Sequence, residues 1–185
     1  YSIADPFVHR KRIASTLGES QGIPVIAVLG NHETLSSPLI WSMDLRDRGL
    51  RVLNNEVSEV KSLDLCVRGL GDYFTSQFRY TDFPAECENK RKVTLTHDPG
   101  GAFHPEMHGL ILSGHTHCGQ IRLPVLGAIF MPTSAPEGAR CGLYRDEKIT
   151  LFVSAGVGTS MLPVRFRAQA QWDLLSLVWE RETPQ

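Results

Sequence analysis

Residues 25–33, Val-Ile-Ala-Val-Leu-Gly-Asn-His-Glu, are the stretch that decides the fold class. The first five form a continuous apolar run rich in β-branched side chains, which is typical of a strand buried on both faces in an α/β sheet. Gly30 to Glu33 follow at once, so these residues stand at the carboxyl end of the predicted strand. Ligands of α/β sheets bind outside the carboxyl ends of strands, which makes Asn31 and His32 candidate functional residues.

The same arrangement recurs at two more predicted buried strands. Residues 92–96 run directly into His97, and residues 110–113 run into a His-Thr-His pattern at His115 and His117. Because the carboxyl ends of such strands meet at one edge of a sheet, we expect the polar residues at all three strand ends to converge. The fold, and no single local loop, would then assemble the site.

Helices are predicted to flank the first of these strands, and further short strands follow. Asp5 suits the N-cap of a helix, Pro6 its first position, and Gly49 the left-handed end of a second helix. We expect helices over residues 4–19 and 37–49, and strands over residues 25–29, 51–53, 57–60, 63–70, 92–96, 110–113, 141–144, 149–154, 164–166 and 174–179. This order of elements indicates an α/β fold.

Composition favours one globular domain over residues 1–185. The chain has 185 residues, of which 42% are hydrophobic and 21% charged, and these values exclude the disordered and coiled-coil classes. A net charge of −1 argues against a nucleic-acid polymer as partner, because that binding needs many clustered Lys and Arg side chains. No apolar stretch approaches the roughly 20 residues of a membrane-spanning helix.

The four cysteines, Cys66, Cys87, Cys118 and Cys141, form no Cys-x-x-Cys pair. Neither a zinc knuckle nor a redox motif is therefore indicated. We expect free thiols in a reducing compartment. The chain begins at Tyr1 without a basic or apolar leader, and we expect that native N-terminal sequence is missing.

The residue types at the three strand ends are those of a metal site. Neutral imidazole is a good ligand for zinc, iron and manganese, and the two rings of a His-x-His pattern can diverge enough to serve two ions. Asn31 adds an amide oxygen. His9, His104 and His108 stand outside this pattern, and we assign them to ordinary surface or structural positions.

At these residues the sequence resembles the calcineurin-like metallophosphoesterases. The matching motifs are Gly-Asn-His-Glu at residues 30–33, Thr-His-Asp-Pro-Gly at 96–100 and the stretch that begins with Ser-Gly-His-Thr-His, at 113–124. Residues 49–56 and 153–166 resemble more narrowly the bacterial YkuE/YaeI-like phosphodiesterase branch. The resemblance covers nearly the whole chain from Ile23 to Trp179. It implies a four-layer sandwich of two mixed β-sheets flanked by helices.

The resemblance also implies a role for each strand-end residue. Asn31, His97 and His115 would bind one metal of a two-metal centre, His117 would bind the other, and His32 would be the catalytic acid. A hydroxide held between two divalent ions of Mn, Fe or Zn would attack phosphorus, while the cations stabilise the growing charge. Cys118 is then a neighbour of the site and not a nucleophile.

Two earlier motifs of the family, Asp-x-His and Gly-Asp, are not present in this sequence. They supply the bridging carboxylate, so two cations about 3.5 to 4 Å apart would repel one another here and the chain alone should bind metal weakly. We expect a C-terminal portion of a longer protein, which lacks the first strands of the fold and has Asp5 as the tail of the Gly-Asp motif. Glu33 and Cys118 replace the family's more usual Asp and Gly.

The predicted function is hydrolysis of a phosphodiester or pyrophosphate. By resemblance the substrate is a small-molecule or lipid-linked phosphoester, such as UDP-2,3-diacylglucosamine. Arg165 is the best candidate for a phosphate clamp, ahead of Arg122 and Arg140, with exposed salt bridging as the ordinary alternative. The expected location is the cytoplasm or the periphery of the inner membrane, with any membrane association made through the missing N-terminus.

Two other functions stay open at this point. One is a non-catalytic scaffold with the metallophosphoesterase fold, against which His32 argues because a scaffold needs no acid there. The other is a module that binds a single metal ion through the strand-end histidines, which the number of ions bound per chain would distinguish. The sequence is silent on oligomeric state and on which metal is bound.

Overall fold

The computed structural model describes residues 6–18 and 22–179. Its centre is a six-stranded mixed sheet with strand order β3-β4-β5-β6-β10-β9. Strands β4, β5, β6 and β10 run parallel to one another, and the outer strands β3 and β9 are antiparallel to their neighbours. The strands are β3 (Glu56–Val60), β4 (Leu65–Gly69), β5 (Arg91–Leu95), β6 (Gly109–Ser113), β9 (Gly142–Arg145) and β10 (Ile149–Val153).

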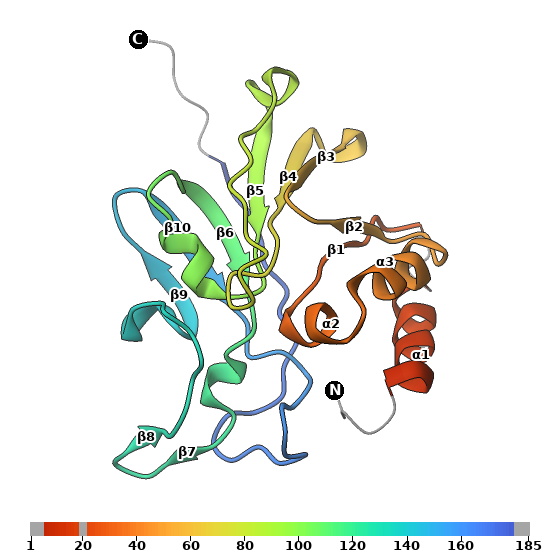
Figure 1. The fold of residues 1–185 in the computed structure, drawn as a ribbon. Coiled ribbons are helices and arrows are strands. Elements are labelled where there is room, and N and C mark those ends of the chain that lie inside the picture. Colours follow the sequence, from red (N-terminus) through yellow and green to blue (C-terminus); the bar gives the residue numbers. More distant parts are fainter. Residues whose placement is uncertain (1–5, 19–21, 180–185) are drawn as a thin grey trace.

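A smaller parallel pair lies beside this sheet, formed by β1 (Ile26–Val28) and β2 (Arg51–Leu53) (Figure 1). The chain passes from one to the other through α2 (Asn31–Ser36) and α3 (Pro38–Arg46), and α1 (Pro6–Gly18) packs against α3. Buried Trp41 and Leu45 of α3 join Ala14 of α1 in one apolar cluster. These helices therefore cover the smaller sheet, as an α/β fold requires.

The two sheets pack directly on one another. Leu53 of the smaller sheet lies in one apolar cluster with Val60 and Val67 of the larger sheet. At the contact, Gly69 leaves no room for a side chain, because a Cβ placed there would stand 2.2 Å from the Leu53 Cβ. The larger sheet buries a second cluster on its other side, which includes Leu70, Ile111 and Leu151. The predicted α/β class, with mixed sheets and flanking helices, is confirmed.

Most predicted elements are found within one or two residues of their expected limits. Gly49 adopts the expected left-handed conformation, with φ of +83°, three residues after α3 ends. Pro6 begins α1, whereas the predicted N-cap Asp5 lies outside the described residues. The short helix α2, which begins inside the Gly-Asn-His-Glu motif, was not predicted.

The predicted strands at residues 164–166 and 174–179 are wrong. The first makes only an isolated bridge between Phe166 and Ile121, and the second has no regular structure. Leu174 and Val178 are almost fully exposed. An apolar, β-branched run becomes a strand only where a neighbouring strand offers its backbone, and no such pairing reaches residues 174–179 among the described strands.

The prediction of free thiols is also wrong, because all four cysteines form disulfides. Cys66 pairs with Cys87, and Cys118 pairs with Cys141, across sequence separations of 21 and 23 residues. The fold brings the two Cα atoms to 6.0 Å in the first pair and to 5.0 Å in the second. The lack of a Cys-x-x-Cys motif therefore did not exclude disulfides between cysteines far apart in the sequence. Disulfides are typical of oxidising compartments.

The small elements complete the fold. They are the 3₁₀ turns η1 (Lys61–Leu63), η2 (Ala85–Cys87), η3 (Pro99–Phe103), η4 (His117–Gly119) and η5 (Glu137–Ala139), and the hairpin strands β7 (Arg122–Leu123) and β8 (Gly127–Ala128). Within residues 6–18 and 22–179, the helices fall short of the length and apolarity that a membrane crossing requires.

Candidate metal centre

Three strand ends bring Asn31, His97 and His115 together. Asn31 opens α2 just after β1, His97 follows β5, and His115 follows β6. The Nε2 atom of His97 lies 3.0 Å from the Asn31 Oδ1 atom and 3.1 Å from the His115 Nδ1 atom. The expected convergence of these side chains is therefore present, and the three residues are called the trio below.

Gly30 allows this approach between the two sheets. A Cβ atom at Gly30 would stand 2.5 Å from the His97 ring, so a larger residue would push the ring away from Asn31. On its other side, His97 is tied to the end of β6, because its carbonyl accepts hydrogen bonds from Ser113 Oγ and the Gly114 N–H. The backbone thus fixes where the His97 ring can lie.

The hydrogen bonds of His115 define its tautomer. Its Nε2 atom lies 2.7 Å from the carbonyl oxygen of Pro132, which can only accept, so Nε2 carries the proton of the neutral ring. The lone pair of Nδ1 then faces His97. A backbone carbonyl that orients a histidine in this way is the usual support of a metal-ligating imidazole.

The two distances within the trio are those of hydrogen bonds, and they also match the spacing of neighbouring ligands on one divalent ion. Ligand atoms bound at about 2.1 Å and at right angles lie about 3.0 Å from one another, which is close to the two distances measured here. Among the described residues, no three His, Cys, Asp or Glu side chains are grouped so that they could hold a metal ion. The trio contains two such residues, and the amide of Asn31 is its third member.

Burial keeps the rings neutral. Desolvation, followed by the nearby rings of His115, His117 and His32, lowers the pKa of His97 from 6.5 to about 3. Desolvation, followed by the charge of Arg165, lowers the pKa of His117 to about 4. Both imidazoles are therefore neutral at neutral pH, which is the form that metal binding requires.

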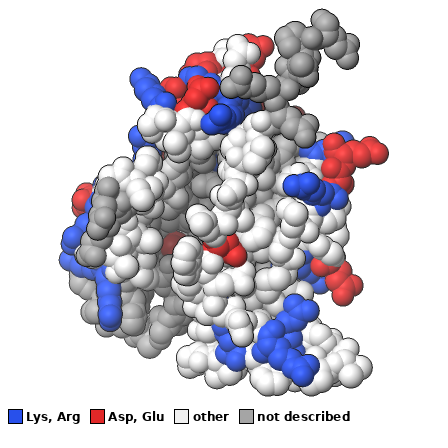
Figure 2. All heavy atoms as spheres, turned by 180° about the vertical axis from the view of Figure 1, so that it is seen from behind, with Lys and Arg blue, Asp and Glu red and all other residues white. Residues whose placement is uncertain are grey.

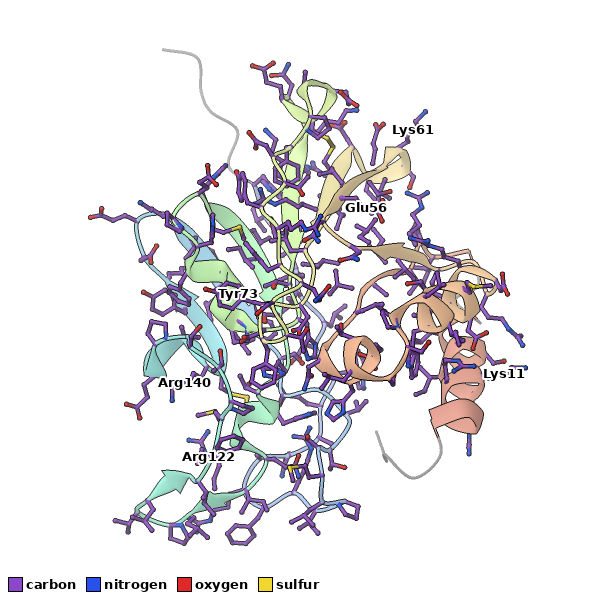
Figure 3. All side chains as sticks on the ribbon, viewed as in Figure 1. Lys11, Glu56, Lys61, Tyr73, Arg122 and Arg140 are labelled. Atoms are coloured by element: carbon purple, nitrogen blue, oxygen red, sulfur yellow. A yellow bond between two sulfur atoms is a disulfide. The ribbon has the colours of Figure 1, made fainter. Side chains whose placement is uncertain are left out.

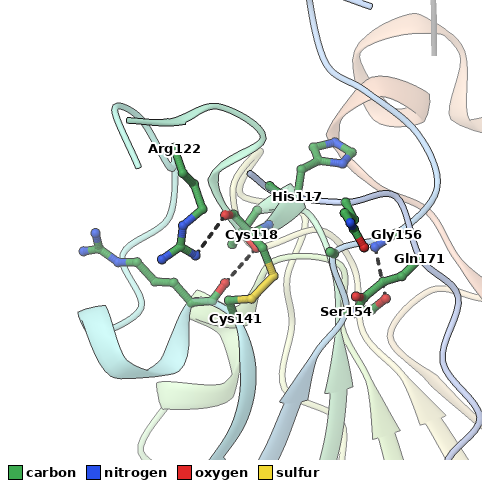
Figure 4. Close-up of a disulfide and its surroundings, with 12 residues drawn as sticks. His117, Cys118, Arg122, Cys141, Ser154, Gly156 and Gln171 are labelled. Carbon is green, nitrogen blue, oxygen red and sulfur yellow. Dashed lines mark hydrogen bonds between the residues drawn. A yellow bond between two sulfur atoms is a disulfide. The ribbon is translucent and has the colours of Figure 1, made fainter. Parts of the chain in front are cut away.

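The turn that carries His115 and His117 has an unusual backbone. His115, His117 and Cys118 have φ angles of +66°, +49° and +51°, in the left-handed region that side chains with a Cβ disfavour. The disulfide from Cys118 to Cys141 and a hydrogen bond from Thr116 Oγ1 to the Arg140 carbonyl hold this turn (Figure 4). Strained backbone that the surroundings hold in place is characteristic of functional sites.

His117 lies beside Arg165. Its Nδ1 atom accepts a hydrogen bond from the Arg165 guanidinium at 3.1 Å. The same guanidinium donates to the backbone carbonyls of Ala155, Gly156 and Gly158, so it holds this loop against His117. Desolvation lowers the pKa of Arg165. Its donors are thus directed to the protein, and its part in phosphate binding stays a prediction.

His32 lies on the other side of the same loop. Its Nε2 atom is 3.4 Å from the hydroxyl of Ser160, and its effect on the pKa of His97 indicates that it is close to the trio.

Two residues that contact the histidines, Pro132 and Ser160, were not predicted from the sequence. Each acts through an irregular segment, where neither periodicity nor a motif gives a signal.

Relatives of this chain are found among curated proteins. The chain is 32% identical over 121 residues to the "Uncharacterized metallophosphoesterase YkuE" of Bacillus subtilis, which covers 64% of this chain and 40% of that protein. It is 29% identical over 165 residues to the "Phosphodiesterase YaeI" of Escherichia coli, covering 84% and 58%. An "Uncharacterized metallophosphoesterase" of Aquifex aeolicus is 33% identical over 151 residues, covering 75% and 55%.

The chain thus spans between two fifths and three fifths of the length of these relatives. No family model matches the chain, and no solved structure matches it. Two of these relatives are named metallophosphoesterases and one is named a phosphodiesterase. These matches make the chain a homologue of the metallophosphoesterases.

Proposed function

We propose that this chain is the part of a metal-dependent phosphoesterase that holds one metal ion through Asn31, His97 and His115 and provides the general acid. The observation that carries the proposal is the convergence of their Oδ1, Nε2 and Nδ1 atoms at 3.0 and 3.1 Å, in a homologue of metallophosphoesterases. The scaffold alternative accounts for neither the neutral rings nor the carbonyl that orients His115.

A bound divalent ion of Mn, Fe or Zn supplies Lewis acidity toward a phosphoryl oxygen and an activated water at neutral pH. The residues of the chain prepare this chemistry. The Pro132 carbonyl holds the proton of His115 on Nε2, so that Nδ1 is free as a ligand atom. Burial of His97 keeps its ring unprotonated far below neutral pH.

His32 is the proposed general acid. It follows Asn31 in the first turn of α2, which places it next to one member of the trio. The Ser160 hydroxyl lies 3.4 Å from Nε2 and orients the ring across the gap between α2 and the loop. A proton held at Nε2 would pass to the departing oxygen, which avoids the release of an alkoxide.

A second ion, held by His117, belongs to the proposal for the complete protein only. In the chain described here, the Arg165 guanidinium donates to His117 Nδ1, so the neutral ring carries its proton on Nε2. Binding an ion through either nitrogen would require this contact to be given up. The geometry therefore favours one ion per chain, which also keeps the single-metal module as a second candidate.

The substrate class rests on the relatives. One relative is named a phosphodiesterase, which supports a phosphodiester as the bond that is cleaved. We propose UDP-2,3-diacylglucosamine, a lipid-linked nucleotide sugar, as an example of the substrate. Of the two predicted locations, the disulfides favour the periphery of the inner membrane on its oxidising side.

The test is Mn²⁺-dependent hydrolysis of bis(p-nitrophenyl) phosphate, measured on this chain and on the complete protein encoded by its gene. The variants are His97→Ala and His32→Ala, with His108→Ala as the control because His108 is exposed and far from the trio. We expect activity in the complete protein that both site variants lose and the control keeps. Activity that survives His97→Ala would overturn the proposal. One tightly bound ion without activity in either form would establish the single-metal module.

A further inference from the structure

Asp98, which follows His97 directly, is a buried carboxylate. It is 1% exposed, whereas most of the Lys, Arg, Asp and Glu side chains visible in Figure 2 lie around the edge of the face shown there. A carboxylate that is removed from water needs hydrogen-bond donors. Its Oδ1 atom accepts hydrogen bonds from the Gly100 N–H at 3.0 Å and from the Thr133 hydroxyl at 2.5 Å. The second bond joins Asp98 to a segment 35 residues further along the chain.

The segment of residues 131–135, called the orienting segment below, carries the carbonyl that directs His115. The Pro132 carbonyl oxygen lies 2.7 Å from the His115 Nε2 atom. Most of the orienting segment has no regular secondary structure, so neither a helix nor a sheet fixes where this carbonyl points. Side-chain contacts therefore matter for its position, and Thr133, the next residue along, makes the contact to Asp98.

The orienting segment packs closely on the 3₁₀ turn η3. A Cβ atom at Gly100 would stand 2.5 Å from the Ser134 Oγ atom and 3.2 Å from the ring of Tyr73, which is labelled in Figure 3. The absence of a side chain at Gly100 thus permits the close approach. At the end of the segment, the Nε atom of Arg140 donates to the Ala135 carbonyl at 2.8 Å. Contacts on two sides therefore hold the segment in place.

We propose that Asp98 and Thr133 are positioning residues, which hold the orienting segment so that the Pro132 carbonyl keeps the proton of His115 on Nε2. A neutral imidazole carries one proton, and the hydrogen-bond partner of its nitrogen selects the tautomer. Asp98 thereby serves both histidines of the trio, since it follows His97 in the chain and reaches His115 through two residues. The consequence for metal binding rests on the proposed function, whereas the tautomer of His115 does not.

The competing tautomer of His115 has a partner of its own. With its proton on Nδ1, the ring would donate to the Nε2 atom of His97, which lies 3.1 Å away. In that form no lone pair of His115 would face the trio, and the ring could not act as a ligand there. The Pro132 carbonyl is the contact that favours the form with a free Nδ1. Its position therefore decides between two tautomers that the site can accommodate.

The test is the tautomer of His115 in the metal-free chain, measured by NMR correlations of the ring nitrogens at neutral pH. Thr133→Val removes the hydroxyl, and Thr133→Ser keeps it. Thr81→Val is the matched control, because the Thr81 hydroxyl donates to the Asn55 carbonyl, between β2 and β3, at 2.9 Å. We expect an unprotonated Nδ1 in the parent chain, in Thr133→Ser and in Thr81→Val. In Thr133→Val, the Nδ1 signal should move toward that of a protonated nitrogen.

Asp98 is tested by a pair of variants of its own. Asp98→Ala removes the acceptor of the Thr133 hydroxyl and should shift the Nδ1 signal of His115 as Thr133→Val does. Asp98→Asn keeps an acceptor oxygen and should leave the signal where it is. Circular dichroism would establish that each variant is folded. If Asp98→Ala does not fold, the variants of Thr133 still decide the question.

A titration with Zn²⁺ measures the consequence for the metal site. Thr133→Val should bind the ion about tenfold more weakly than the parent chain, and Thr133→Ser should restore the affinity. An unchanged His115 tautomer in Thr133→Val, or an equal shift in Thr81→Val, would overturn the inference. If the parent chain binds no Zn²⁺, the proposed function fails, while the tautomer still tests the roles of Asp98 and Thr133.

Discussion

The side chains of the trio and those of His32 and His117 are held in different ways. The trio of Asn31, His97 and His115 stands on the ends of strands, with contacts of 3.0 and 3.1 Å between its side chains. His117 and His32 instead take their contacts from the loop of residues 155–169, through Arg165 and Ser160. The comparison teaches that strand ends position the proposed metal ligands of the trio, whereas the contacts of His32 and His117 come from an irregular segment.

The sharpest test of this difference is a metal titration of two alanine variants. His97→Ala should weaken the binding of the first ion roughly 1,000-fold, about 4 kcal/mol, because a ligand in the middle of the trio is lost. His117→Ala should change the same affinity less than threefold, since its ring faces Arg165. Calorimetry with Zn²⁺ or Mn²⁺ measures both values. Equal losses in the two variants would mean that the rings act as one unit.

Acid should act on the trio through His97. Its pKa is about 3 in the folded chain and 6.5 in an unfolded one, so the unfolded chain binds the extra proton between these values. The stability of the metal-free chain should therefore fall as the pH is lowered from 6.5 toward 3, by an amount on the order of 3 kcal/mol from this residue. Urea unfolding across this range measures the slope, and His97→Gln should flatten it. An unchanged slope in His97→Gln would place the acid sensitivity elsewhere.

Reduction should act on the turn that carries His115 and His117. The Cys118–Cys141 disulfide closes 23 residues and fixes the strained turn after His115, so its removal should cost about 3 kcal/mol of stability. Cys118→Ser with Cys141→Ser isolates this bond, and Cys66→Ser with Cys87→Ser is the matched control with a separation of 21 residues. Both pairs should destabilise the chain, but the first alone should also weaken the binding of metal at the trio.

The disulfides also show where prediction from sequence ends. The apolar runs before Gly30, His97 and Gly114 predicted buried strands, and the rule for strand ends then predicted that Asn31, His97 and His115 would lie close together, as their contacts show. Such runs carry their own structural signal because a strand buried on both faces tolerates little else. The pairing of Cys118 with Cys141 and the contact of Arg165 with His117 arise from segments brought together only by the complete fold, so no local pattern encodes them.

The smallest expected change concerns the pKa of His117 alone. Burial is the main reason that this pKa is about 4, and the positive charge of Arg165 is the next. Arg165→Gln removes a cation beside the ring, which favours the imidazolium form, so the pKa of His117 should rise. The pKa should nevertheless stay below 6.5, because the ring remains buried and burial is the main cause of the lowered value. NMR titration of the ring of His117 measures this value in the parent chain and in the variant. If the pKa of His117 stayed the same in Arg165→Gln, the charge of Arg165 would not contribute to the lowered pKa, and burial of the ring would have to account for it.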